Sequence, residues 1–149
     1  MNTIVYADMV ILTTKGFGDT MDITDAVKKI QEKSGVVNGL VTVFCHGSTG
    51  TITTIEFEPG VIQDLKKALE KIMPSNVPYE HDKAWGDGNG FSHVRAALMK
   101  PSLSIPVVEG RMSLGMWQQI VFIDFDNRPR ERKVVVQVIG HDGKERNQG

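Results

Sequence analysis

The sequence predicts an α+β protein in which short antiparallel strands form a sandwich or a barrel with a few helices attached. Three observations carry this expectation. β-Rich segments alternate with turns of Gly, Pro and Asn, two segments show helical periodicity, and 149 residues with 40% hydrophobic and 23% charged side chains suit one globular domain over residues 1–149. A packed core is therefore expected.

The N-terminal half alternates between the two kinds of element. An apolar, β-branched run at 3–14 indicates one strand or two short ones, and Ile23, Val27 and Ile30 mark a helical face. Pro74 ends a second, strongly amphipathic helix. The expected elements are strands over 3–14, 36–44 and 51–57 and helices over 22–34 and 59–73.

The C-terminal half opens with a histidine-rich loop and is then mostly β. The loop spans 81–95 and leads into a short helix that Lys100-Pro101 ends, so His93 is expected in the first helical turn. There the helix dipole favours the neutral imidazole, which is the form that binds metals. Strands are expected over 104–108, 116–125 and 133–139, and His141 is expected in a C-terminal tail.

The charge pattern excludes some classes of partner. The net charge is −1, and the basic residues are spread along the chain, so the footprint of a nucleic-acid-binding protein is missing. No apolar run approaches about 20 residues and no signal-peptide pattern is present, so neither a membrane partner nor export is expected and the cytoplasm is the predicted compartment. The single cysteine, Cys45, is expected in the core.

Three of the four histidines form a candidate metal site. His46, His81 and His93 each stand beside a glycine-rich polar segment. Three neutral imidazoles with an open fourth position are typical of catalytic zinc. The alternative is that each histidine forms local hydrogen bonds. Asp87 and Asn89 either fix the imidazole tautomers or act as turn residues.

Further candidates lie outside the histidine-rich loop. Glu56 is either a general base or a surface residue at a helix start. Arg111 and the neighbours Trp117 and Gln118 suit an anionic or heteroaromatic ligand, although Trp117 equally suits the core.

Two more segments can take an anion. The turn at 47–50, which contains Ser48, either binds an anion through backbone N–H groups or connects a plain hairpin. Arg130 and Arg132 share one face of a strand, where they hold a phosphate, contact a second subunit or are simply solvated.

A series of short motifs follows one another in a fixed order along nearly the whole chain. The motifs are Ser34-Gly-Val, Cys45-His46 with Gly47-Ser-Thr, Glu56 with Pro59 and Asp64, Tyr79-Glu-His81, Gly86-Asp-Gly-Asn-Gly-Phe-Ser-His93, Ile105-Pro-Val-Val-Glu-Gly-Arg111, Leu114-Gly-Met-Trp-Gln-Gln and Arg128-Pro-Arg-Glu-Arg132. Together they resemble the YjbQ family, also called secondary thiamine-phosphate synthases.

The resemblance implies a compact β-sandwich with flanking helices, assembled as a homotrimer. It also implies a metal, with zinc expected, held by His46, His81 and His93 near a subunit boundary. The implied activity joins hydroxymethylpyrimidine diphosphate to thiazole phosphate and releases pyrophosphate. Two departures from the family pattern matter. The commoner pattern is His-Thr-Ser-Ala with Asn-Glu further on, whereas here Gly47-Ser48-Thr49 follows the histidine and the acidic residue is Glu56, in a Thr-Thr-Ile-Glu setting.

The leading hypothesis is therefore a metal-dependent transferase acting on phosphorylated heterocycles. The alternatives are a metal-dependent hydrolase of a phosphorylated or acylated small molecule and a non-catalytic trimer that binds a metal or a metabolite. The predicted roles are catalytic for Glu56, Asp87 and Arg111, substrate-binding for Ser48, Asn89, Trp117, Gln118, Arg130 and Arg132, and metal-binding for His46, His81 and His93.

Overall fold

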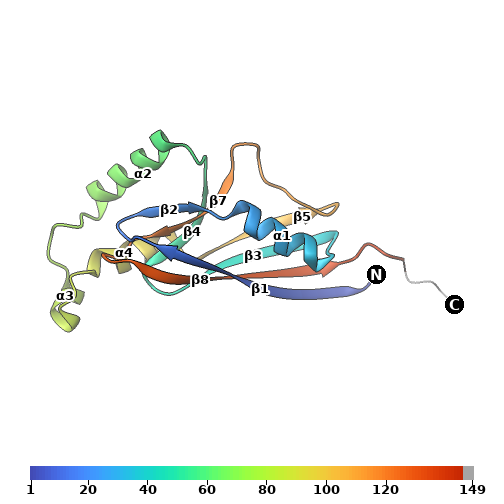
Figure 1. Cartoon of the computed structure of the whole chain (residues 1–149), viewed down its shortest axis with the longest axis horizontal. Helices are drawn as coiled ribbons and strands as arrows, with labels where there is room; N and C mark the ends of the chain where they lie inside the picture. The colour runs from blue at the N-terminus through green and yellow to red at the C-terminus, as the bar shows by residue number, and fades with distance from the viewer. Residues whose placement is uncertain (146–149) are drawn as a thin grey trace.

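The computed structural model describes residues 1–145. Within them the chain forms eight strands and four helices (Figure 1), and no helix is long and apolar enough to cross a membrane. The elements in order are β1 Thr3–Thr14, β2 Asp19–Asp22, α1 Thr24–Ser34, β3 Asn38–His46, β4 Gly50–Ile55, α2 Pro59–Ile72, α3 Glu80–Trp85, α4 Gly90–Met99, β5 Ser102–Val108, β6 Arg111–Met112, β7 Gln119–Asp124 and β8 Arg130–His141.

The strands form two antiparallel sheets. The larger sheet has the order β1-β8-β3-β5-β6, and the smaller sheet has the order β2-β7-β4. β1 and β8 pair along their whole length, from Thr3 opposite His141 to Thr14 opposite Arg130. Figure 1 shows these two long strands running along the molecule, with α3 and α4 at the end away from the N-terminus.

The core lies in two layers on either side of the small sheet. Alternate residues of β7 face opposite sides, so Ile120 and Phe122 join α1 and the large sheet, while Val121 and Ile123 join α2 and α4. All four of these β7 side chains are buried. The predicted α+β fold, an antiparallel β-sandwich with flanking helices, is confirmed.

Local signals explain the helix boundaries. The Glu58 carboxylate accepts hydrogen bonds from the backbone N–H groups of Gly60 and Val61 at 2.7 and 2.9 Å, which caps α2. At the end of α1, Gly35 adopts a left-handed conformation with φ 73° and donates its N–H to the Glu32 carbonyl.

Several expected boundaries were wrong. Residues 116–118 precede β7, and His141 ends β8 opposite Thr3 and does not lie in a tail. Residues 3–14 form one strand, which was one of the two expected alternatives. β2 and α3 were not expected, because a strand of four residues and a helix of six carry too little periodicity to stand out.

Four chain segments meet at the end of the sandwich near α3 and α4. β3 ends there at His46, β4 begins at Gly50, β7 ends at Asp124 and β8 begins at Arg130. The short connections between these strands therefore lie beside the two helices, and this junction contains the candidate site.

Candidate functional site

A polar pocket of about 340 Å³ opens at this junction. It is bounded by the turn between β3 and β4, by α3 and the loop after it, by the first turn of α4 and by the start of β8. The lining residues are Gly47, Ser48, Thr49, His81, Trp85, Asp87, Asn89, His93, Arg130 and Arg132. Seven of these ten were predicted site residues, namely Ser48, His81, Asp87, Asn89, His93, Arg130 and Arg132.

Two of the predicted metal ligands lie face to face in this pocket. The ring centroids of His81, from α3, and His93, from α4, are 4.3 Å apart and the rings are tilted by 48°. Burial lowers the pKa of His93, and the neighbouring His81 lowers it further, against the opposing effect of Asp126 and Asp87. His93 is therefore held in its neutral form, with a lone pair available for a cation or a proton.

Arg132 is fixed at the back of the pocket by a buried carboxylate. Its Nε and Nη2 donate to the two oxygens of Asp124, each at 2.7 Å, and Nη2 also donates to Thr49 Oγ1 at 2.6 Å. Burial acts to lower the pKa of Arg132, but the bond to Asp124 and its charge raise it above the ordinary value. The guanidinium is thus permanently charged and held in one orientation.

Arg130 is held by a second buried carboxylate. Its Nε donates to Asp126 Oδ2 at 2.8 Å. Asp126 also accepts hydrogen bonds from Thr49 Oγ1, from Asn89 Nδ2 and from the backbone N–H of Asn127. Burial acts to raise the pKa of Asp126, but these hydrogen bonds and Arg130 lower it below its usual range. Both arginines are therefore positioned in advance of any ligand.

Asn89 leaves one buried polar atom without a partner. It is only 3% exposed, and its Oδ1 has no hydrogen-bond partner, whereas Nδ2 donates to Asp126 Oδ1 at 3.3 Å. Rotating the amide by half a turn would place its oxygen against that carboxylate, so the orientation is fixed. A buried acceptor without a donor is costly, and a ligand in the pocket can supply what is missing.

The charges of the pocket favour a cation and an anion together. The two guanidiniums are balanced by Asp124 and Asp126, and Asp87 adds an exposed carboxylate at the rim. The electron-pair donors are the imidazoles of His81 and His93 and the amide oxygen of Asn89, which suit a cation, and the guanidiniums suit an anion.

These donors fit a divalent transition metal in kind. Only two of the three histidines expected as ligands, His81 and His93, are among them. Among residues 1–145, no three His, Cys, Asp or Glu side chains lie close enough together to hold a metal ion. The three-histidine centre stays a prediction.

His46 does not line this pocket. It is exposed on the outer face of β3, opposite Lys133, whereas Cys45, 1% exposed, faces the core as predicted. Alternation along a strand separates the two side chains. The hairpin alternative for the turn at 47–49 is wrong, because β3 and β4 belong to different sheets.

Glu56, Trp117 and Gln118 lie at the other end of the small sheet. Gly50 pairs with Asp124 beside the pocket, and Ile55 pairs with Gln119 at the opposite end, about 17 Å along the strand. The core alternative for Trp117 is wrong, because its side chain is 68% exposed. Gln118 is held by hydrogen bonds to Thr54 and to the Gly115 N–H.

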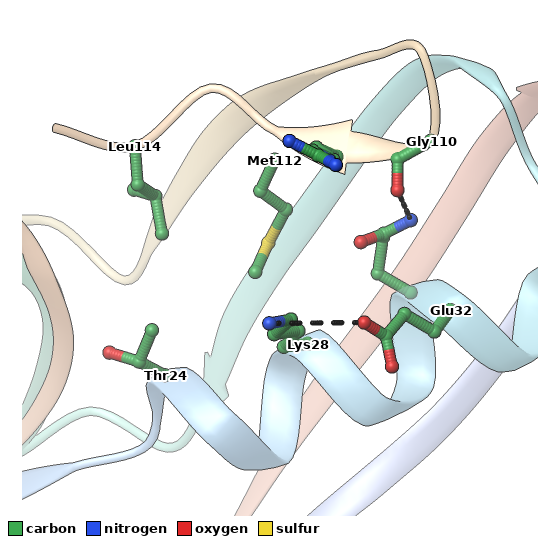
Figure 2. Close-up of a pocket in the computed structure, with 8 residues that line it drawn as sticks. Thr24, Lys28, Glu32, Gly110, Met112 and Leu114 are labelled. Atoms are coloured by element: carbon green, nitrogen blue, oxygen red, sulfur yellow. Dashed lines mark hydrogen bonds and ion pairs between the residues drawn. The ribbon is translucent and has the colours of Figure 1, made fainter. Parts of the chain in front are cut away.

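Arg111 lines a separate cavity of about 500 Å³ between α1 and β6. Figure 2 shows this cavity, with Lys28 and Glu32 of α1 facing the strand that carries Met112. β6 pairs with the Val107 end of β5, opposite the start of β3, so Arg111 lies at the far end of the sandwich from His93.

Sequence reasoning missed three important residues. Trp85 lines the pocket with a side chain that is 77% exposed, and Asp124 and Asp126 hold the arginines although both are fully buried. The sequence did contain a signal for the two aspartates, because they alternate with Phe125 directly after the apolar run 120–123. An acid inside a buried strand needs a cationic partner.

Comparison with known proteins gives the family. The family model described as UPF0047 protein YjbQ-like matches residues 9–141. This chain belongs to the YjbQ family. A family member of Methanothermobacter thermautotrophicus, named only as a UPF0047 protein, is 38% identical over 136 residues, which cover 91% of this chain and 93% of that protein.

Solved structures of YjbQ proteins share the fold. A YjbQ-like protein of unknown function from Sulfolobus solfataricus is 30% identical with a TM-score of 0.89, covering 94% of this chain and 100% of that one. An uncharacterised family protein from Clostridium acetobutylicum is 37% identical with a TM-score of 0.80, covering 88% and 98%. These relatives establish the family and the fold.

Proposed function

We propose that this YjbQ protein is a metal-dependent enzyme that acts on a phosphorylated small molecule in the polar pocket. The specific reaction is the transfer expected from the family resemblance. It joins hydroxymethylpyrimidine diphosphate to thiazole phosphate. The thiazole nitrogen forms a bond to the methylene carbon of the pyrimidine while the carbon–oxygen bond breaks, and pyrophosphate leaves with the bonding electrons.

The observation that carries the proposal is the unpaired Oδ1 of Asn89 beside two imidazoles and two fixed guanidiniums. A buried acceptor next to His81 and His93 attracts a cation or a hydrogen-bond donor, and the arginines attract phosphate oxygens. A phosphorylated ligand bound with a divalent metal satisfies all of these groups together.

Each side chain then has a role that its position supports. Arg130 and Arg132 hold phosphate oxygens, because both residues line the pocket and Asp126 and Asp124 fix the orientation of their guanidinium groups. The ring of Trp85 offers a surface on which a heteroaromatic group stacks. A metal, with zinc expected, supplies charge neutralisation for the departing pyrophosphate, and His81 and His93 would hold it.

A homotrimer and a cytoplasmic location are part of the proposal. The outer face of the large sheet is apolar: Val5 pairs with Ile139, which pairs with Leu40, and these side chains are 63%, 48% and 50% exposed. His46 lies on this same face, so a second copy that covers it would place His46 at a subunit boundary. Sedimentation equilibrium tests this, and a mass of 16.5 kDa would contradict it.

The direct test is formation of thiamine phosphate from the two substrates with added zinc. We expect His93→Ala to lower the rate about 100-fold or more while circular dichroism stays unchanged. His141→Ala is the matched control, because His141 lies at the opposite end of β8. Wild-type protein without product, or His93→Ala with full turnover, would refute the proposed reaction.

The hydrolase alternative uses the same pocket with water as acceptor. Asp87 favours it as a second candidate, because its exposed carboxylate at the pocket rim is available to orient a water molecule. The hydrolase alternative predicts that hydroxymethylpyrimidine diphosphate releases pyrophosphate or phosphate when thiazole phosphate is left out. Strict dependence on thiazole phosphate would exclude it.

A further inference from the structure

A second hollow adjoins the polar pocket and differs from it in chemistry. It has a volume of about 250 Å³ and is lined mainly by small and apolar groups, among them Ala96, Ala97 and Pro101. Gly47, Ser48 and His93 line both spaces, so the two are direct neighbours. A ligand held at the arginines therefore has an apolar space beside it.

Helix geometry explains why the polar and apolar spaces meet at His93. Residues three and four positions apart lie on one face of a helix, so His93, Ala96 and Ala97 share the face of α4 that is directed to the turn at 47–50. The first turn of that face is polar, and the next carries only methyl groups. The hollow exists because alanines, and not larger apolar residues, occupy the second turn.

The neighbouring pocket provides independent evidence that a ligand belongs here. Asn89, at the start of α4, is 3% exposed and its Oδ1 has no partner. A ligand that reaches Asn89 and the arginines has the hollow lined by Ala97 and Pro101 next to it. Apolar atoms placed there contact mainly small apolar groups, together with His93 and Ser48.

We propose that the site takes a phosphate monoester or diphosphate whose organic part has an apolar segment next to the phosphate, seated in the hollow over Ala97. This inference rests on the proposed function, because it assumes that the arginine side of the pocket binds phosphate. Ala97 then determines specificity, since its small side chain leaves the hollow open.

The test is a series of alkyl phosphates, from methyl to butyl phosphate, titrated into the zinc-treated protein by calorimetry. We expect the affinity to rise about two- to fourfold for each methylene group that enters the hollow. In Ala97→Leu, whose side chain fills the hollow, this rise with chain length should disappear. Ala68→Leu, an exposed change on α2, is the matched control and should keep it.

The outcomes separate the inference from the proposed function. If methyl phosphate binds but longer chains bind no better, or if Ala97→Leu keeps the rise, the apolar subsite is refuted and the phosphate site stands. If neither inorganic phosphate nor any ester binds, the proposed function fails as well. The ¹³C methyl resonances of Ala96 and Ala97 give a second measurement: they should shift with butyl phosphate more than with methyl phosphate, and equal shifts would overturn the subsite.

Discussion

Replacing Asp124 by asparagine should destabilise the fold strongly, because several buried donors share this one carboxylate as their acceptor. It is fully buried and accepts four hydrogen bonds, two from Arg132 at 2.7 Å, one from Thr14 Oγ1 at 2.5 Å and one from the Asp126 N–H at 3.0 Å. Asparagine keeps one acceptor oxygen, loses the charge and turns an N–H₂ group towards donors.

The expected loss follows from what remains around Arg132. The guanidinium is 7% exposed, and its nearest other carboxylate oxygen, Asp126 Oδ2, is 3.8 Å from Nη2. Removing one partner of a buried ion pair typically costs about 3–5 kcal/mol. We therefore expect Asp124→Asn to lower the free energy of unfolding by this amount, measured by urea denaturation with circular dichroism.

A surface ion pair and a double variant control this measurement. Lys28 and Glu32 form an exposed pair at 3.9 Å, so Glu32→Gln should cost no more than about 0.5 kcal/mol. The double variant Asp124→Asn/Arg132→Met should lose less stability than the sum of the two single variants, because it removes both charges. A loss below about 1 kcal/mol for Asp124→Asn, or strict additivity, would refute the assigned role of the pair.

Three further predictions concern single residues. His93 should titrate in metal-free protein with an NMR midpoint below 6.5, the ordinary pKa of histidine. As pH drops through 6.5 towards that midpoint, the free energy of unfolding should fall, because the unfolded chain takes up the proton first. A midpoint above 6.5 would contradict this. Cys45, whose pKa burial raises to about 11, should react with thiol reagents only after unfolding; fast native labelling would be inconsistent. Gly16→Ala should lower the free energy of unfolding in urea by more than about 2 kcal/mol, and Gly86→Ala should lower it by about 1 kcal/mol. Both glycines have a positive φ, but a Cβ at Gly16 would also lie 2.6 Å from the Arg128 carbonyl oxygen, whereas a Cβ at Gly86 would meet no atom within 4 Å. Equal losses for the two variants would refute the clash at Gly16.

The sequence was a good guide wherever a pattern was local and long. The amphipathic helix α2 and the core position of Cys45 were predicted, because the first depends on residue spacing along one element and the second on the residue type. The placement of His93 in the first turn of α4 was predicted from the glycine-rich loop before it and the proline after the helix.

The site was harder to predict because its parts come together only through the fold. His81, His93 and Arg130 were identified as candidates, yet their meeting depends on where β3, β7 and β8 end. The residues around Arg111 and Glu56 in the sequence do not reveal that both lie away from the polar pocket. The motifs name residues in chain order, and order along the chain does not fix distance in space.

Metal analysis of purified, tag-free protein is the decisive measurement for the site between α3 and α4. After incubation with zinc and removal of excess, we expect about one metal ion per chain in wild type and in His141→Ala. In His81→Ala/His93→Ala we expect that ion to be lost while circular dichroism stays unchanged. Wild-type protein that holds no metal, or a double variant that keeps it, would contradict a metal-assisted site between α3 and α4.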